Sequence, residues 1–305
     1  MSLAVKEILN IGCRQLGECG ITDAAIDSKL LYCHLMNITT TQLILEYQQT
    51  LSDALCDEYF KLLDIRSSGV PLQHITGVQE FMGLEFAVNE HVLIPRQDTE
   101  TLVEDAMDVI AKNELRGETL PIKAKRDYEI LDLCCGSGAI GVSLAALCPN
   151  VKVTCSDLSK DAVTVAKQNA SKLAAGKKVS FEEGNLLMPF KGRFKNKKFD
   201  MIISNPPYIK TSVIPTLQKE VRDHEPMMAL DGGTSGLDFY RQIIADAAAC
   251  LKKEGVLMFE IGHDQKEDVC ALLEETEQFE NITALQDLAK RDRIIFATLA
   301  PKRNK

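Results

Sequence analysis

The sequence predicts an α/β protein whose larger part is a mostly parallel sheet with helices on both faces, preceded by a small helical domain. After about residue 128, apolar strand-like segments alternate with helical segments, which is the pattern of a parallel sheet. Near the start of the chain, apolar residues instead recur at helical spacing. Between these parts, short apolar pieces flank a glycine, as in a β-hairpin. We therefore expect a helical domain at 1–75, a linking hairpin at 76–95 and a sheet domain at 96–305.

In the helical segment, the spacing of apolar residues predicts the helices, and capping or breaking residues predict where they begin and end. Its repeating apolar residues include Ile8, Leu9, Cys13 and Leu16, then Ala25, Ile26, Leu30, Leu31 and Leu35. Thr22 or Asp23 can cap the second helix, Ser52 can cap the last one, and Gly69 and Pro71 end it. This segment carries no visible catalytic chemistry. We interpret it as a docking surface for a partner, with a purely fold-completing role as the alternative.

The sheet domain opens with a helix that begins at Asp98, and its remaining elements follow in alternation. Strands are predicted at 129–134, 151–157, 179–184, 199–204, 255–261 and 293–299, with a short strand near 281–286. Helices are predicted at 139–148, 159–174, 236–252 and 265–276. Strands that alternate with helices in this way build a parallel sheet that is covered on both sides.

Composition narrows the class of protein. The chain has 305 residues, 45% of them hydrophobic and 26% charged, which is typical of a globular protein. No apolar run approaches the length of a membrane helix and the start lacks a signal-peptide pattern, so we expect a cytoplasmic protein. The net charge of −9 argues against broad nucleic-acid binding. One basic run, at 191–198, could contact an acidic partner, but a solvated loop is the favoured interpretation.

The cysteines give no sign of a metal site. The ten cysteines are scattered, no C-x-x-C occurs, and no histidine pairs with them at zinc spacing. We therefore predict reduced, mostly buried thiols and no metal.

A glycine-rich turn joins the first predicted strand of the sheet to its helix. Gly136, Gly138 and Gly141 spell G-x-G-x-x-G, and Asp157 ends the next strand about twenty residues later. Taken alone, this pattern also fits a dinucleotide site or a tight turn without a ligand. Asp132, four residues before the first glycine, would repel a pyrophosphate but suits a positive amino or sulfonium group. The pattern resembles the class I S-adenosylmethionine-dependent methyltransferases.

That resemblance implies a fold, a cofactor and its contacts. The fold is a Rossmann-like sheet of seven strands, mostly parallel, with the last strand antiparallel. The cofactor is S-adenosylmethionine, which leaves as S-adenosylhomocysteine. Asp157 would take the ribose hydroxyls, and the turn would pass under the amino-acid end of the cofactor. The implied cofactor contacts are Asp132, Cys134, Cys135, Gly136, Ser137, Gly138, Asp157, Leu186 and Asn205.

A second motif, Asn-Pro-Pro-Tyr at 205–208, follows the fourth strand after the helical domain and hairpin. Ligands bind beyond the carboxyl ends of strands in open α/β sheets, so Asn205 should face the cofactor's methyl group. A planar nitrogen is a poor nucleophile and needs acceptors for its N–H groups as the transition state forms. The Asn205 side-chain oxygen and the Pro206 carbonyl can serve, Pro207 fixes the loop, and Tyr208 offers a flat face to the substrate. The motif is typical of amino-methyltransferases acting on adenine, guanine or glutamine.

The flanking segments select among these substrates by resemblance. The segment 68–104, the block from Glu225 to Leu237, and "FEIGHDQ" at 259–265 are similar to the release factor glutamine methyltransferases, the HemK or PrmC family. This implies methylation of N5 of the glutamine in the Gly-Gly-Gln motif of class I release factors, in support of translation termination. Asn205 to Tyr208 would grip the glutamine amide. Arg96, Thr99 and Glu100 would support the pocket wall.

One position departs from the family's glycine loop, because Cys134 stands where a glycine is usual. If its φ is positive, the backbone there is strained and cofactor affinity is lowered. The alternative function is an adenine-N6 or guanine-N2 nucleic-acid methyltransferase, and a non-catalytic binding protein is a third reading. We expect a monomer.

Overall fold

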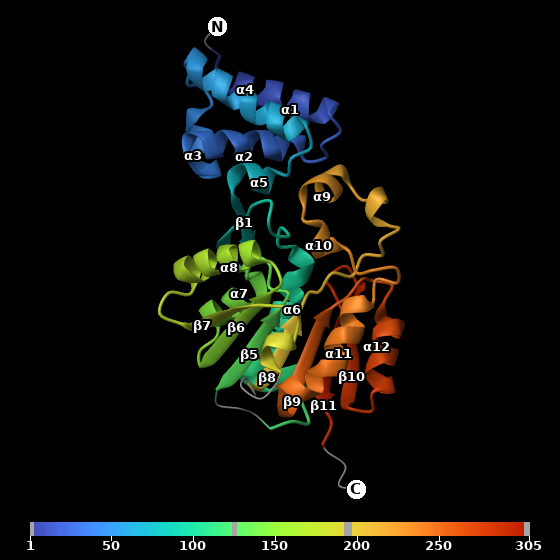
Figure 1. Cartoon of the computed structure of the whole chain (residues 1–305). Helices are drawn as coiled ribbons and strands as arrows, with labels where there is room; N and C mark the ends of the chain where they lie inside the picture. Colours follow the sequence, from blue (N-terminus) through green and yellow to red (C-terminus); the bar gives the residue numbers. More distant parts are fainter. Residues whose placement is uncertain (1–2, 124–126, 192–196, 302–305) are drawn as a thin grey trace. The chain divides into compact units, whose positions relative to one another are not determined.

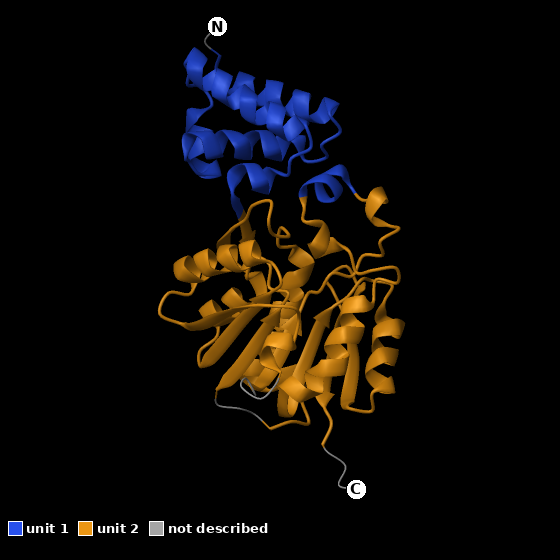
Figure 2. Ribbon diagram, viewed as in Figure 1, with its two compact units in different colours: residues 1–78, 218–224 blue, residues 79–217, 225–305 orange. Residues whose placement is uncertain are grey.

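The computed structural model describes residues 3–123, 127–191 and 197–301, and the chain divides into two compact units (Figure 1 and Figure 2). Unit 1 comprises residues 1–78 and 218–224, and unit 2 comprises residues 79–217 and 225–305. Most of the basic run at 191–198 lies outside the described residues. Within the described ranges, no helix combines the length and apolar character needed to span a bilayer.

Unit 1 is helical. Its elements are α1 (Val5–Glu18), α2 (Ala24–Met36), α3 (Thr40–Glu46), α4 (Asp53–Ser67), α5 (Leu72–Thr76) and α9 (Lys219–His224). Ser52 caps α4 as predicted, because its Oγ accepts from the Leu55 N–H at 3.4 Å. Asp23 stands at the N-cap of α2 without a side-chain capping bond. Ile8, Leu31 and other fully buried side chains form the core.

The α9 segment joins unit 1 through a buried arginine. Arg66 Nε lies 2.7 Å from Asp27 Oδ2, and its Nη2 lies 2.7 Å from Glu220 Oε1. The Lys219 Nζ also donates to the Ser68 carbonyl at 2.6 Å. A buried guanidinium needs anionic partners, and one of them comes from 154 residues along the chain. Residues 218–224 therefore belong with the N-terminal helices, which no sequence pattern indicated.

Unit 2 is built on a seven-stranded sheet in the order β10-β11-β9-β8-β5-β6-β7. The strands are β5 (Tyr128–Leu133), β6 (Val151–Asp157), β7 (Lys178–Glu183), β8 (Phe199–Ser204), β9 (Leu251–Glu260), β10 (Phe279–Gln286) and β11 (Asp292–Leu299). Within this sheet, β11 runs antiparallel to its neighbours β9 and β10, and the other described pairs of strands are parallel. The predicted sheet is confirmed, with strand ends shifted by at most four residues.

Helices cover both faces of this sheet (Figure 1). They are α6 (Gln97–Lys112), α7 (Ala139–Leu147), α8 (Lys160–Leu173), α11 (Asp238–Cys250) and α12 (Lys266–Glu275), with a short α10 (Met227–Leu230). Successive strand residues point to opposite faces. Ile130 packs with residues of α6, α7 and α8, whereas its neighbour Leu131 packs with residues of α11 and α12. Strands that are buried on both faces of a sheet appear in the sequence as continuous apolar runs, and these runs predict their positions.

The hairpin is shorter than the predicted segment 76–95. It pairs β1 (Val78–Phe81) with β2 (Leu84–Ala87), and both turn residues, Met82 and Gly83, have positive φ. The stretch after it forms no strand, although Val92 and Ile94 are buried there. A second, very small pair, β3 (Glu114–Leu115) with β4 (Glu118–Thr119), was not predicted.

Candidate active site

A cavity of about 480 Å³ in unit 2 opens beyond the carboxyl ends of β5, β6 and β8. This volume is typical of small-molecule sites. The predicted site residues that line it are Cys134, Gly136, Asp157, Leu186, Asn205 and Pro207. The sheet therefore brings the glycine turn and the Asn-Pro-Pro-Tyr motif to the walls of one cavity.

The glycine turn runs through the left-handed region of backbone space. Cys134 has φ of 59°, Gly136 of 52° and Gly138 of 81°. A Cβ at position 138 would lie 3.0 Å from Val142 Cγ2 and 3.1 Å from Ala166 Cβ, so this glycine permits close packing of α7 and α8. The positive φ at Cys134 makes the anticipated backbone strain real, because an L-residue there costs about 1–2 kcal/mol.

Two carboxylates lie beside this turn, and only one of them lines the cavity. Asp132 is fully buried and does not line the cavity; its Oδ2 accepts from the Gly141 N–H at 2.8 Å. Burial raises the pKa of Asp132 to about 7. Asp157 does line the cavity, and its two oxygens accept from the Gly136 and Ser159 N–H groups, each at 2.9 Å. A carboxylate has about four lone-pair sites, so Asp157 can still accept a hydrogen bond from a ligand hydroxyl.

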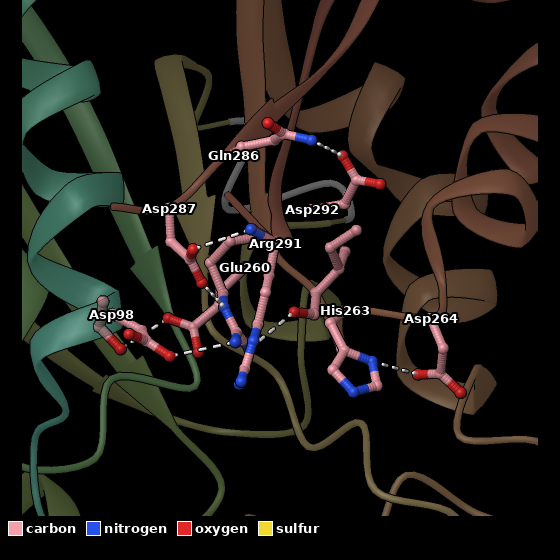
Figure 3. A network of polar contacts seen from close by, with 12 residues as sticks. Asp98, Glu260, His263, Asp264, Gln286, Asp287, Arg291 and Asp292 are labelled. Carbon is pink, nitrogen blue, oxygen red and sulfur yellow. Dashed lines mark hydrogen bonds and ion pairs between the residues drawn. The ribbon is translucent and has the colours of Figure 1, made fainter. Parts of the chain in front are cut away.

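Asn205 and Tyr208 are tied to one buried acid, Glu260, at the end of β9. Asn205 Nδ2 donates to Thr99 Oγ1 at 3.3 Å, and Thr99 Oγ1 donates to Glu260 Oε2 at 2.6 Å. The Tyr208 hydroxyl donates to Glu260 Oε1 at 3.3 Å. Burial raises the pKa of the Tyr208 hydroxyl, which keeps it protonated as a donor. Figure 3 shows Glu260 in the same polar network as Asp98 and Asp287.

The segment 230–232, just after α10, packs against the backbone at the end of the Asn-Pro-Pro-Tyr motif. The Ile209 N–H donates to the Leu230 carbonyl, and the Gly232 N–H donates to the Ile209 carbonyl. A Cβ at position 232 would lie 2.7 Å from Tyr208 Cα, so only glycine fits there. This contact fixes the peptide path of the motif.

The remaining predicted residues are not among those that line the cavity. Arg96 Nη2 forms a 2.6 Å ion pair with Glu225 Oε1, next to the cavity-lining Pro226. Glu100 Oε1 accepts from the Met82 N–H in the hairpin turn at 2.6 Å. Neither side chain lines the cavity, so each can act on it only through the loop it holds. The predicted residues that do not line it are Arg96, Thr99, Glu100, Asp132, Cys135, Ser137, Gly138, Pro206 and Tyr208.

Comparison with known proteins identifies the family. A release factor glutamine methyltransferase of Clostridium acetobutylicum is 38% identical over 89% of this chain and 90% of its own length. One from Moorella thermoacetica is 37% identical over 97% of this chain and 98% of its own length. This chain belongs to the release factor glutamine methyltransferase family.

Two domain models agree with the family assignment. The model of the PrmC N-terminal domain matches residues 7–77, and the model of the methyltransferase small domain matches residues 114–221. A crystal structure of a protein-(glutamine-N5) methyltransferase from Alicyclobacillus acidocaldarius is 28% identical, covers 71% of this chain and all of that chain, and has a TM-score of 0.42.

Several residues at the site were not anticipated from the sequence of this family member. No sequence motif indicates a role for Glu260, although this residue ends a central strand at the ligand-binding edge of the sheet. Asn169 of α8 donates to the Ser137 carbonyl of the glycine turn at 2.9 Å. Leu158, Met227 and Met228 are exposed apolar side chains that line the cavity. Leu158 lies in a loop and the two methionines lie in the short α10, whose positions no short-range sequence pattern predicts.

Proposed function

We propose that this chain transfers a methyl group from S-adenosylmethionine to N5 of the glutamine in the Gly-Gly-Gln motif of class I peptide release factors. The observation that supports it most is the meeting of the glycine turn and Asn205 at one cavity, in a chain that shares its family with release factor glutamine methyltransferases. Modification of that glutamine would support translation termination.

The cavity has features that suit the cofactor. A Cβ at Gly136 would meet nothing within 4 Å, so the backbone of the turn is open to a ligand on that side. The Asp157 carboxylate can accept from ribose hydroxyls, and exposed apolar side chains can cover a flat ring. The turn 134–138, Asp157 and Leu186 are the residues we propose for its contacts. Asp132, which is fully buried, would act only indirectly, by holding the Gly141 N–H of the following helix. When bound, S-adenosylmethionine supplies a methyl group on a positively charged sulfur.

The Asn-Pro-Pro-Tyr motif would hold the substrate amide. The Asn205 Oδ1 and the Pro206 carbonyl would accept hydrogen bonds from the glutamine NH₂ and so push electron density toward its nitrogen. Tyr208 would lie against the planar amide. The nitrogen lone pair would form the new N–C bond, and the electron pair of the broken C–S bond would stay on sulfur. The nitrogen then releases one proton to water.

The helical unit is proposed as the docking surface for the release factor. Ile44 and Leu45 of α3 are highly exposed apolar residues, at 62% and 81%. We expect Ile44→Ser with Leu45→Ser to raise KM for the release factor and to leave S-adenosylhomocysteine affinity unchanged. Leu288→Ser, at a 96% exposed apolar residue of unit 2, is the matched control. An unchanged KM in the double variant would remove this part of the proposal.

The decisive experiment is the intact mass of an unmethylated release factor after incubation with the protein and S-adenosylmethionine. One added methyl on the Gly-Gly-Gln glutamine, absent with Asn205→Ala, is the expected result. A DNA duplex and an RNA serve as competing substrates. Methyl transfer to either of them, with none to the release factor, would replace the proposal by the nucleic-acid alternative.

A further inference from the structure

The Asn205 side chain has two ends that look alike in shape but differ in chemistry. Only its oxygen can accept from a substrate amide, because its NH₂ group only donates. If the amide turned over, a donor would face the substrate NH₂ and the proposed contact would become repulsive. The proposed contact therefore requires a neighbouring group that fixes the orientation of the Asn205 amide.

The hydrogen bonds of Thr99 fix this orientation. Glu260 is only 2% exposed, and both of its side-chain oxygens receive hydrogen bonds, from Thr99 at 2.6 Å and from Tyr208 at 3.3 Å. An ionised carboxylate only accepts, so Thr99 must use its single proton on Glu260. Its oxygen can then only accept from Asn205, which must present Nδ2 at 3.3 Å and turn Oδ1 away.

Three neighbours of Glu260 stabilise the ionised form that this direction requires, although burial leaves its pKa above the ordinary value. Burial raises the pKa of Glu260, and the hydrogen bond from Thr99, the nearby Arg293 and the hydrogen bond from Tyr208 oppose that rise. The Asp98 carboxylate also raises the pKa of Glu260, but it is paired with Arg293, whose Nη2 lies 3.0 Å from Asp98 Oδ2. The Tyr240 hydroxyl also holds the Glu260 backbone carbonyl at 2.8 Å, which fixes the residue in place.

We infer that Glu260, acting through the Thr99 hydroxyl, is a positioning residue that orients the Asn205 amide so that Oδ1 faces the substrate. The effect of this orientation on kcat rests on the proposed function. The orientation itself is a property of the protein alone and can be measured without a substrate.

The first test is the NMR signal of the Asn205 side-chain NH₂ in selectively labelled protein, assigned by its loss in Asn205→Ala. Thr99→Val keeps the side-chain shape and removes the hydroxyl. We expect Thr99→Val and Glu260→Gln to shift this signal. Thr298→Val is the matched control, because Thr298 is also buried and also makes two hydrogen bonds, to Asn281 and Glu280 rather than to Asn205. An Asn205 signal that is unmoved in Thr99→Val, or moved as far in Thr298→Val, overturns the inference even if no release factor is methylated.

The second test is kinetic. Thr99→Val should lower kcat for release factor methylation at least about tenfold, the loss expected for one oriented hydrogen bond. KM and S-adenosylhomocysteine affinity should change by less than about twofold on the same scale, because the relay acts on orientation rather than on binding. Thr99→Ser should recover most of the lost kcat. Equal losses in the Ser and Val variants would show that the methyl group matters and not the hydroxyl, and would overturn the inference.

Adding Glu260→Gln to Thr99→Val completes the kinetic test. Both residues act through one hydrogen-bond chain, so the double variant should lose little more kcat than the worse single variant. Fully additive losses would contradict the relay. If the wild-type protein methylates no release factor, the proposed function fails while the NMR result still decides the orientation.

Discussion

Asn169 on α8 pairs with the backbone of Ala87 as a neighbouring strand would: its Oδ1 accepts from the Ala87 N–H at 2.7 Å, and its Nδ2 donates to the Ala87 carbonyl at 3.0 Å. The same Nδ2 donates to the Ser137 carbonyl of the glycine turn at 2.9 Å. One fully buried side chain therefore joins the end of the hairpin to the turn that walls the cavity.

Asn169→Ala should destabilise unit 2 and weaken cofactor binding together. Two half-buried backbone groups of Ala87 and the buried Ser137 carbonyl lose their partner, which costs about 2–4 kcal/mol of unfolding free energy. Urea unfolding and calorimetric titration with S-adenosylhomocysteine would measure the two effects. Thr164→Ala, at an exposed position of the same helix, is the control and should change stability by less than about 0.5 kcal/mol. Wild-type affinity in Asn169→Ala would show that the turn holds its shape without this contact.

Asp132 should make the stability of the protein depend on pH. Its pKa rises from 3.8 in the unfolded chain to about 7 in the folded one, so the folded state binds the proton more tightly. Its contribution to stability is full below pH 3.8 and is lost as pH rises through about 7. Relative to Asp132→Asn, the wild type should lose on the order of 2–3 kcal/mol between pH 5 and pH 8. Unfolding curves of both proteins across that range, without cofactor, give the comparison, and parallel pH profiles would refute a raised pKa.

Cys134→Gly should stabilise the protein. Glycine removes the left-handed strain but adds freedom to the unfolded chain, so the expected net gain is up to about 1 kcal/mol. Cys134→Ala keeps the strain and removes only the sulfur, so it should bring no gain. The two melting temperatures separate backbone strain from packing. We also expect S-adenosylhomocysteine to bind Cys134→Gly at least as tightly as the wild type, and weaker binding would argue that the thiol itself contacts the cofactor.

Arg66→Met should loosen residues 218–224. The change leaves Asp27 as a buried carboxylate without its cation, which costs on the order of 3 kcal/mol. It also removes the ion pair to Glu220, so trypsin should cut faster after Lys219 and Arg222. Digestion followed by mass spectrometry measures this, with Arg14→Met as a control at an exposed arginine of unit 1. Equal cleavage rates in both variants would mean that other contacts hold α9.

The sheet was predictable because each of its strands carries its own signal. The apolar run at Met201–Ile203, for example, is buried on both faces and ends in residues that stop a strand. The positive φ at Cys134 was also foreseeable, since a glycine is usual there in this family. Such features depend on residues close together in the sequence.

The supporting contacts of the site could not be predicted in this way. Thr99 and Glu260 are 161 residues apart, and Asn169 and Ala87 are 82 apart. Their hydrogen bonds exist only after the sheet and helices have assembled, and a lone polar residue on a strand or helix does not indicate its partner. The same is true of Glu220, whose partner Arg66 lies in another part of the sequence.

The chain passes between the two units more than once, and this limits how chimeras of this protein and a homologue can be built. The chain passes from one unit to the other at 78/79, 217/218 and 224/225. A chimera of two homologues joined once near residue 78 would inherit Arg66 from one parent and Glu220 from the other. The N-terminal helices are therefore not a module that a single crossover can exchange, and a transplant that keeps them intact must carry residues 218–224 along.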